Sequence, residues 1–109
     1  MTAYLTVLCT CPDAETARIL AETLIERRQA ACVNILSGVS SVYQWQGKQE
    51  SVEESLLLIK TRENRYNALQ ESILELHPYE LPEIIAVPII TGFTPYLEWI
   101  DAHCGTEHD

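Results

Sequence analysis

The first thirty residues combine a short extended run with a helical repeat. Residues 4–10 are mostly apolar or β-branched, which predicts a strand, and the following Cys11-Pro12-Asp13 ends it. Apolar residues then recur with helical spacing at Ala17, Leu20, Ala21, Leu24 and Ile25. Charged residues occupy the opposite side, and Asp13 is well placed to cap the helix. The pattern predicts a strand followed by a helix that faces a core.

A long β-hairpin is predicted in the middle of the chain. Residues 31–45 are extended in character, with a bulge or bend expected at Gly38, and residues 48–60 return after a Gln-Gly turn. Arms of about thirteen residues would each span about 40 Å, whereas a compact domain of this size has a radius of gyration of about 13 Å. The hairpin must therefore project beyond the domain, with Tyr43 and Trp45 near its tip.

A second helix, a strand and a short helix complete the pattern. We expect Thr61 to cap the second helix and Pro78 to end it. Its apolar stripe consists of Tyr66, Leu69, Ile73 and Leu76. Residues 84–90 form a continuous apolar strand, and residues 94–102 form the last helix.

The order of these elements predicts the fold. Strand, helix, strand, strand, helix, strand corresponds to two βαβ halves, and right-handed crossovers then give a four-stranded antiparallel sheet with two helices on one face. We therefore predict an α+β fold of the ferredoxin-like, split βαβ type, with a long hairpin between the second and third strands and an extra C-terminal helix. The 109 residues make a single domain, 1–109, whose last residues, 105–109, should be frayed.

The predicted sheet is apolar on both faces. Leu56-Leu57-Leu58-Ile59 and Ile84-Ile85-Ala86-Val87 are apolar at consecutive positions, whereas a sheet with one solvated face should alternate. Two helices shield only one face of the sheet. We therefore expect the other face, the hairpin and the last helix to meet further copies of the chain, with closed symmetry of two or three copies.

The charge of the chain limits its partners. Sixteen acidic and seven basic residues give a formal net charge of -9, which argues against binding to nucleic acid. There is no long apolar run, and the first residues do not resemble a targeting segment, so we expect a cytoplasmic protein without a membrane partner. Its four cysteines would then be reduced.

The segment from His77 to Glu83 is the richest in candidate ligands. Pro78 and Pro82 restrict the residues before them, so the imidazole and the Glu80 and Glu83 carboxylates should point in defined directions. Alternatively, His77 simply ends a helix, where a cation suits the negative end of the helix dipole.

Two cysteines add a second source of candidate ligands. Cys9 and Cys11 should point to the same face of the first strand, and a thiolate with an imidazole and carboxylates suits copper or zinc better than calcium or magnesium. Catalysis is not expected. The chain has no glycine-rich phosphate loop, and nothing in the spacing brings either thiol to His77 as a nucleophile and base.

Six blocks of sequence, in one order, resemble a known family. They are Leu8-Cys9-Thr10, Ala30-Ala31-Cys32-Val33-Asn34, Ser41-Val42-Tyr43-Gln44-Trp45-Gln46-Gly47-Lys48, Glu54 through Lys60-Thr61, His77-Pro78-Tyr79-Glu80-Leu81-Pro82-Glu83 and Tyr96-Leu97-Glu98-Trp99. Over residues 4–99 the chain resembles the CutA divalent-cation tolerance proteins. The resemblance implies a cytoplasmic homotrimer of ferredoxin-like subunits that is linked to tolerance of copper and other divalent ions.

The resemblance also implies particular metal ligands. In bacterial members, copper is assigned to a thiol of the first strand and to two imidazoles at the end of the second helix. The thiol corresponds to Cys9 and the second imidazole to His77, but Leu76 takes the place of the first. Glu80 or Glu83 would then have to compensate for the missing imidazole.

Two other functions remain open. The architecture of the family resembles that of trimeric nitrogen-regulatory proteins, which suggests a module that binds a small effector in the cleft between subunits. The third possibility is a non-catalytic assembly scaffold whose metal contacts are incidental.

Overall fold

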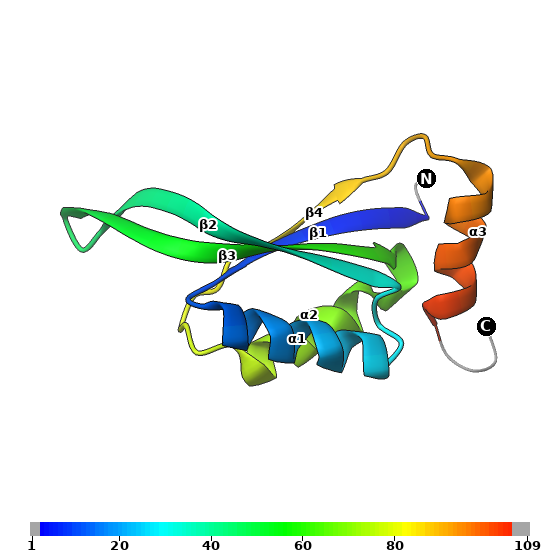
Figure 1. The fold of residues 1–109 in the computed structure, drawn as a ribbon, viewed down its shortest axis with the longest axis horizontal. Helices are drawn as coiled ribbons and strands as arrows, with labels where there is room; N and C mark the ends of the chain where they lie inside the picture. Colours follow the sequence, from blue (N-terminus) through cyan, green and yellow to red (C-terminus); the bar gives the residue numbers. More distant parts are fainter. Residues whose placement is uncertain (1–2, 106–109) are drawn as a thin grey trace.

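The computed structural model describes residues 3–105, and the fraying expected at the C-terminus falls mainly outside this range. The elements are β1 (Tyr4–Cys11), α1 (Ala14–Glu26), β2 (Cys32–Trp45), β3 (Lys48–Arg62), the 3₁₀ turn η1 (Glu63–Arg65), α2 (Tyr66–Leu76), β4 (Ile84–Pro88) and α3 (Thr94–His103). The four strands form one antiparallel sheet in the order β2-β3-β1-β4, and α1 and α2 lie on one face of it (Figure 1). The predicted split βαβ fold is confirmed.

Helix α1 begins at the predicted cap. Asp13 is extended, and its carboxylate accepts a hydrogen bond of 2.7 Å from the backbone N–H of Thr16. The buried residues of α1 are Ala17, Leu20, Ala21 and Leu24. Ile25, which was also predicted to face the core, lies at the edge of this stripe and is exposed.

The predicted cap of the second helix is wrong. Thr61 belongs to β3, where it pairs with Leu5, and its buried hydroxyl donates a hydrogen bond of 2.7 Å to the Gln29 carbonyl. These partners lie far away in the sequence, and they extend β3 to Arg62, so that a 3₁₀ turn precedes α2. Leu76 is also more exposed than predicted, because α2 buries mainly Leu69, Ser72 and Ile73.

The fourth strand is shorter than predicted. It ends at Pro88 rather than at residue 90, although the N–H of Ile89 still donates a hydrogen bond to the Tyr4 carbonyl over 3.0 Å.

The hairpin of β2 and β3 projects as predicted. The two strands pair from Cys32 and Lys60 to Trp45 and Lys48, with an irregularity next to Gly38, whose φ is +75°. The outer part of the hairpin extends past both helices (Figure 1), and the longest dimension of the molecule is 46 Å. Trp45, near the tip, is 45% exposed.

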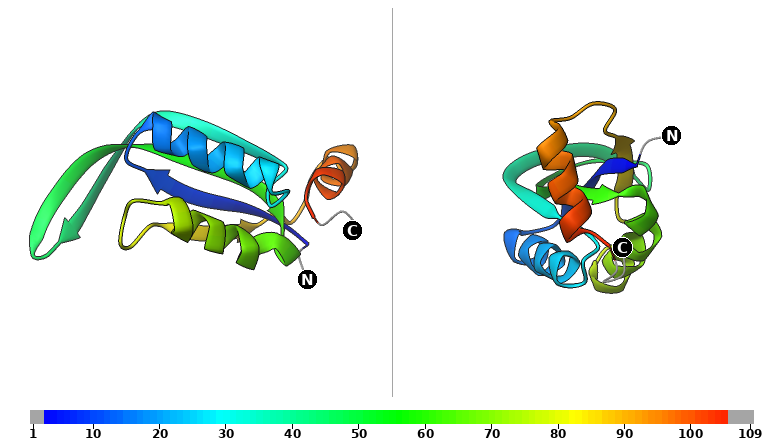
Figure 2. Two further views of the ribbon diagram at one scale, coloured as in Figure 1. Left: turned by 90° about the horizontal axis from the view of Figure 1, so that it is seen from below. Right: turned by 90° about the vertical axis from the view of Figure 1, so that its right-hand side faces the viewer.

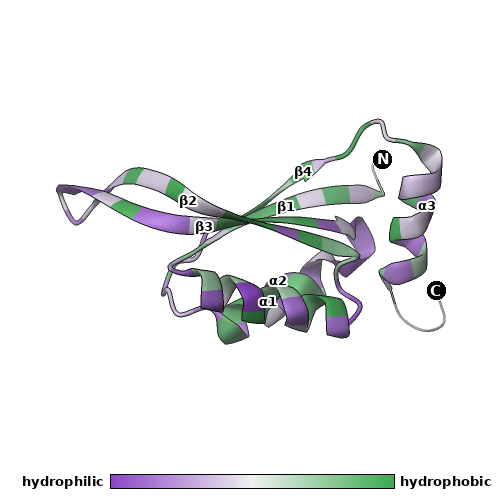
Figure 3. Ribbon diagram, in the orientation of Figure 1, coloured by the Kyte–Doolittle hydropathy of each residue, from purple (hydrophilic) through white to green (hydrophobic). Residues whose placement is uncertain are grey.

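The two faces of the sheet differ in burial, although both carry large apolar side chains. On the face that the helices cover, Val7, Leu57 and Ile59 are completely buried. The open face carries residues that alternate with these along the strands. Its apolar members are Leu8, Leu36, Leu56, Leu58, Ile85 and Val87. Figure 3 shows this apolar character along the strands, and Ile85 remains 53% exposed.

Helix α3 packs at the end of the sheet opposite the hairpin tip, not across the open face (Figure 2). Ile100 of α3 and Cys104, which follows the helix, are buried in a cluster with Ala31. Asp101 accepts a hydrogen bond of 2.7 Å from the Tyr4 hydroxyl and pairs with Arg62 at 2.9 Å. Within residues 3–105, none of the helices has the length and apolar character needed to cross a membrane.

Candidate metal site

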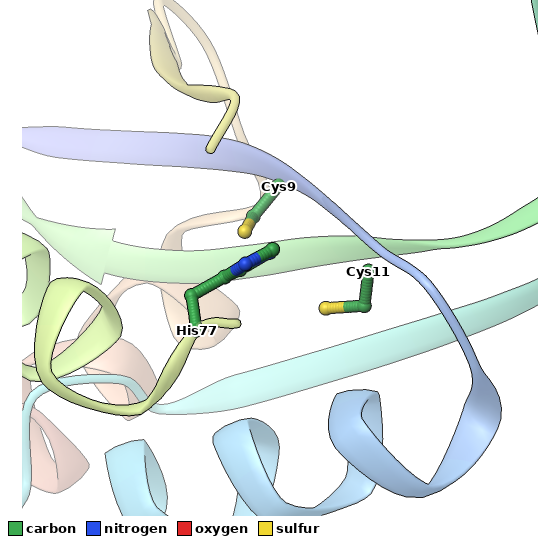
Figure 4. Close-up of side chains that lie close together, drawn as sticks. All are labelled: Cys9, Cys11 and His77. Atoms are coloured by element: carbon green, nitrogen blue, oxygen red, sulfur yellow. The ribbon is translucent and has the colours of Figure 1, made fainter. Parts of the chain in front are cut away.

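Three potential metal ligands meet beneath the sheet, on the face that the helices cover. The Sγ atoms of Cys9 and Cys11 and a ring nitrogen of His77 lie within 4.8 Å of one another, and all three residues are buried (Figure 4). Strand β1 supplies the two thiols, and the residue that follows α2 supplies the imidazole. The fold therefore unites groups that are close to seventy positions apart in the sequence.

The alternation of β1 explains why both thiols reach this place. Residues two apart in a strand point to the same face, and Val7, Cys9 and Cys11 all face the helices and are completely buried. The prediction that the two thiols share a face is confirmed.

His77 is held by the end of α2. Its N–H donates the last helical hydrogen bond to the Ile73 carbonyl over 2.8 Å, and its extended backbone suits the residue before Pro78. His77 therefore ends the helix, and its buried side chain also lies close to the two thiols.

The imidazole already has two hydrogen-bond partners. Its Nδ1 accepts a bond from the Tyr79 N–H over 3.2 Å, so the ring hydrogen resides on Nε2, which donates to the Thr10 carbonyl over 2.7 Å. The Tyr79 ring also lies against it, with centroids 4.8 Å apart. In this arrangement His77 ties the end of α2 to β1.

The two thiols influence each other's ionisation. The interaction with Cys11, reinforced by burial, raises the pKa of the Cys9 thiol far above its ordinary range. The same interaction lowers the pKa of Cys11, in spite of its burial. Since the thiolate is the form that binds metals, the uptake of an ion depends on the two thiols together.

The predicted carboxylates lie outside this compact group. Glu80 and Glu83 are both exposed, although the charge of Glu83 is near enough to contribute to the raised pKa of Cys9. Leu76, at the position of the family's first imidazole, is 36% exposed and is also not part of the group.

A buried carboxylate that sequence reasoning did not single out lies next to the thiols. Glu54 is only 8% exposed, and it accepts a hydrogen bond of 2.8 Å from the Tyr79 hydroxyl. Burial, together with the hydrogen bond to Glu54 and its negative charge, raises the pKa of Tyr79. The same charge opposes ionisation of both thiols. The sequence signal for it was weak, because Glu54 occurs in a charged stretch of a strand whose register only the structure defines.

A family comparison agrees with these features. The family model described as "CutA1 divalent ion tolerance protein" matches residues 5–103 of the chain. This chain belongs to the CutA1 family. The resemblance noted from the sequence blocks is thereby confirmed.

CutA proteins of known sequence match most of the chain. The divalent-cation tolerance protein CutA of Thermus thermophilus is 46% identical over 91% of this chain and 96% of its own length. The CutA of an Escherichia coli strain is 40% identical over 93% of this chain and 90% of its own.

Solved CutA1 structures share the fold. The Thermus thermophilus protein has a TM-score of 0.92 at 45% identity, with 94% of this chain and 99% of that chain covered. CutA1 from Oryza sativa has a TM-score of 0.93 at 42% identity, with 95% of each chain covered. The family name connects these CutA1 proteins with tolerance of divalent cations, and the solved structures share the α+β fold of this chain.

Proposed function

We propose that this CutA1 protein supports tolerance of divalent cations by binding them as a cytoplasmic homotrimer, with Cys9 and His77 as ligands. The observation that carries this proposal is the buried group of two thiols and one imidazole within 4.8 Å. Thiolate and imidazole ligands suit copper and zinc, and copper is the first candidate because of the ligands to which the family resemblance points. We assign no catalytic role to these residues.

The two carboxylates in the segment from His77 to Glu83 are proposed to assist binding from outside the group of direct ligands. Glu80 and Glu83 are exposed in the segment that follows His77, and their negative charge would attract cations to this part of the surface. Either carboxylate would reach the metal ion as a direct ligand only if residues 80–83 moved toward Cys9 and His77.

The open face of the sheet supports assembly. Leu36, Ile85 and Val87 are 42–53% exposed on this face, and they join the partly buried Leu8, Leu56 and Leu58 into one apolar surface. An apolar surface of this kind on a small protein marks an interaction site. Closed symmetry is the usual solution, and the resemblance to CutA proteins favours three copies.

The state of the cysteines supports a cytoplasmic location. Cys9, Cys11, Cys32 and Cys104 are all unpaired thiols, as expected in a reducing compartment. Location varies among relatives, since one from Arabidopsis thaliana is named chloroplastic and a solved structure from Archaeoglobus fulgidus is titled periplasmic.

One observation favours the scaffold as a second candidate. Both ring nitrogens of His77 have hydrogen-bond partners, which is the arrangement of a histidine that serves the fold alone. A scaffold would keep its assembled mass without binding metal ions.

Calorimetric titration of the reduced protein with copper and zinc separates the two candidates. Metal binding predicts heat of binding at micromolar ion, which Cys9→Ser and His77→Ala abolish. Cys32→Ser is the matched control, because this thiol lies on the opposite face of the sheet and should leave binding intact. A flat titration of the wild-type protein with a defined trimeric mass would favour the scaffold over metal binding.

A further inference from the structure

We infer that Cys11 is a third metal ligand, and that Cys9, Cys11 and His77 form a site for a thiophilic, closed-shell divalent cation such as Zn²⁺ or Cd²⁺. The inference rests on the proposed function, since it takes Cys9 and His77 as ligands. It adds a residue that the family's copper ligands do not include, and it changes the class of ion that the site prefers.

The positions of the three donors suit such an ion. With Zn–S distances of about 2.3 Å and Zn–N distances of about 2.0–2.1 Å, the ligand atoms of a tetrahedral site lie about 3.5–3.8 Å apart. The present separations are at most 4.8 Å, so a contraction of about 1 Å would bring the atoms into place. Two of the donors belong to one strand, two residues apart, and the strand already presents them together.

The burial of the site makes its total charge decisive. Cys9 and Cys11 are completely buried, and an uncompensated charge there would be costly. Two thiolates, a neutral imidazole and a divalent cation add up to zero. A monovalent copper ion would leave one uncompensated negative charge in this buried place, near a Glu54 carboxylate that is only 8% exposed.

Divalent copper meets a different obstacle. A pair of neighbouring thiolates can form a disulfide by giving up two electrons, one to each of two Cu²⁺ ions, which become Cu⁺. A site with two neighbouring thiols would therefore reduce Cu²⁺ to Cu⁺ instead of keeping it bound as Cu²⁺. Zn²⁺ and Cd²⁺ have filled d shells and do not oxidise thiolates.

The hydrogen bonds of His77 determine what metal binding would cost. Histidine ligands commonly donate their other ring N–H to a carbonyl, which fixes the tautomer, and here Nε2–H donates to the Thr10 carbonyl over 2.7 Å. The unprotonated Nδ1 has the longer bond of 3.2 Å from the Tyr79 N–H. A metal ion on Nδ1 would replace this longer bond, whereas a metal ion on Nε2 would replace the bond to Thr10 and require the ring hydrogen to move to Nδ1.

The test is a titration of the reduced protein with Cd²⁺ under anaerobic conditions. The ultraviolet charge-transfer absorption of cadmium thiolates is measured after each addition. We expect one ion per chain with the intensity of two thiolates. In Cys11→Ser the intensity per bound ion should fall by half and the Kd should rise about 100-fold or more, since loss of outer-shell support alone costs about 10–100-fold. Cys32→Ser should match the wild-type protein.

Controls for folding keep the result interpretable. The thermal unfolding of metal-free Cys11→Ser is compared with that of the wild-type protein, and Cys11→Ala provides a second variant of similar size without a hydroxyl. Both variants should show the same loss of one thiolate.

Three results would overturn the inference, and they differ in what they leave standing. If Cys9→Ser abolishes Cd²⁺ binding while Cys11→Ser and Cys11→Ala change neither intensity nor Kd, the proposed function stands without Cys11. If the reduced protein binds Cu⁺ but not Cd²⁺, the charge argument is wrong while metal binding survives. If it binds none of the ions tested, including Zn²⁺, the proposed function fails as well.

Discussion

The two faces of the sheet are made by alternate residues of the same strands, yet they end in opposite environments. In β3, Leu57 and Ile59 are completely buried under the helices, whereas the neighbouring Leu56 and Leu58 are only partly buried. In β4, Ile85 and Val87 remain about half exposed. Since both faces carry large apolar side chains, one chain completes the burial of only one face, and the apolar part of the open face is the part of the molecule that needs a partner.

The candidate metal ligands lie on the sheet face that α1 and α2 of the same chain cover. Cys9, Cys11 and His77 lie in the covered layer, among residues that pack within one subunit. Metal binding and assembly should therefore respond to different substitutions. Substitutions on the covered face should change metal binding or subunit stability, and substitutions on the open face should change assembly.

The largest effect is expected from the covered face. Leu57→Ala should lower the free energy of unfolding by about 2–5 kcal/mol, because it leaves a cavity in the core. Chemical denaturation at several protein concentrations measures the loss, which should not depend on concentration.

Leu56→Ala is the matched variant on the other face, one residue away. Its cost should grow with the degree of assembly, since Leu56 is buried further only by another copy. Equal, concentration-independent losses for the two variants would remove the distinction between the faces.

An intermediate effect is expected from a charge on the open face. Ile85→Asp would place a carboxylate in an apolar contact between copies, and we expect a loss of about 2 kcal/mol or more of association free energy per contact. Light scattering should show a lower mass, while Cd²⁺ binding per chain persists. An unchanged mass would show that Ile85 lies outside any interface.

The hairpin tip offers a second place to disturb assembly. Trp45 is 45% exposed on the projecting hairpin, and Trp45→Asp should weaken association if the tip packs on another copy. Stability and mass that both match the wild-type protein would contradict an interfacial tip.

The smallest effect concerns the hydrogen bond beside the thiols. Tyr79→Phe should cost about 1 kcal/mol, because Glu54 loses a partner while the ring itself is more than one-third exposed. The pKa of Tyr79 is raised in the folded state, so the stabilisation is present below about pH 10 and is lost as the pH rises toward the folded pKa. Denaturation curves on either side of pH 10 should therefore converge for the two proteins; a gap that widens with pH would contradict the assignment.

Local patterns in the sequence predicted most of the fold. Asp13 caps α1 through a residue three positions away, and Gly38 supplies a positive φ at an irregularity of the hairpin, so both follow from neighbouring residues. The role of Thr61 could not be predicted in this way. Its partners, Leu5 and the Gln29 carbonyl, are tertiary, and they outweigh its preference for a helix cap.

The candidate site shows the same limit. Alternation predicted that Cys9 and Cys11 share a face, but no spacing rule could place His77 against them, because the contact depends on how α2 packs against β1. Glu54 was missed for the same reason. Its burial depends on the register of β3 and on the Tyr79 hydroxyl, which is supplied by a segment 25 residues away.

Native mass spectrometry of the reduced protein with a small excess of Cd²⁺ tests the central claim most directly, because one spectrum reports both the copies in the assembly and the ions in each copy. We predict a trimer that carries one ion per chain, together with single chains from Ile85→Asp that still carry one ion each. A wild-type protein that stays a folded single chain without bound metal would contradict the account of both faces.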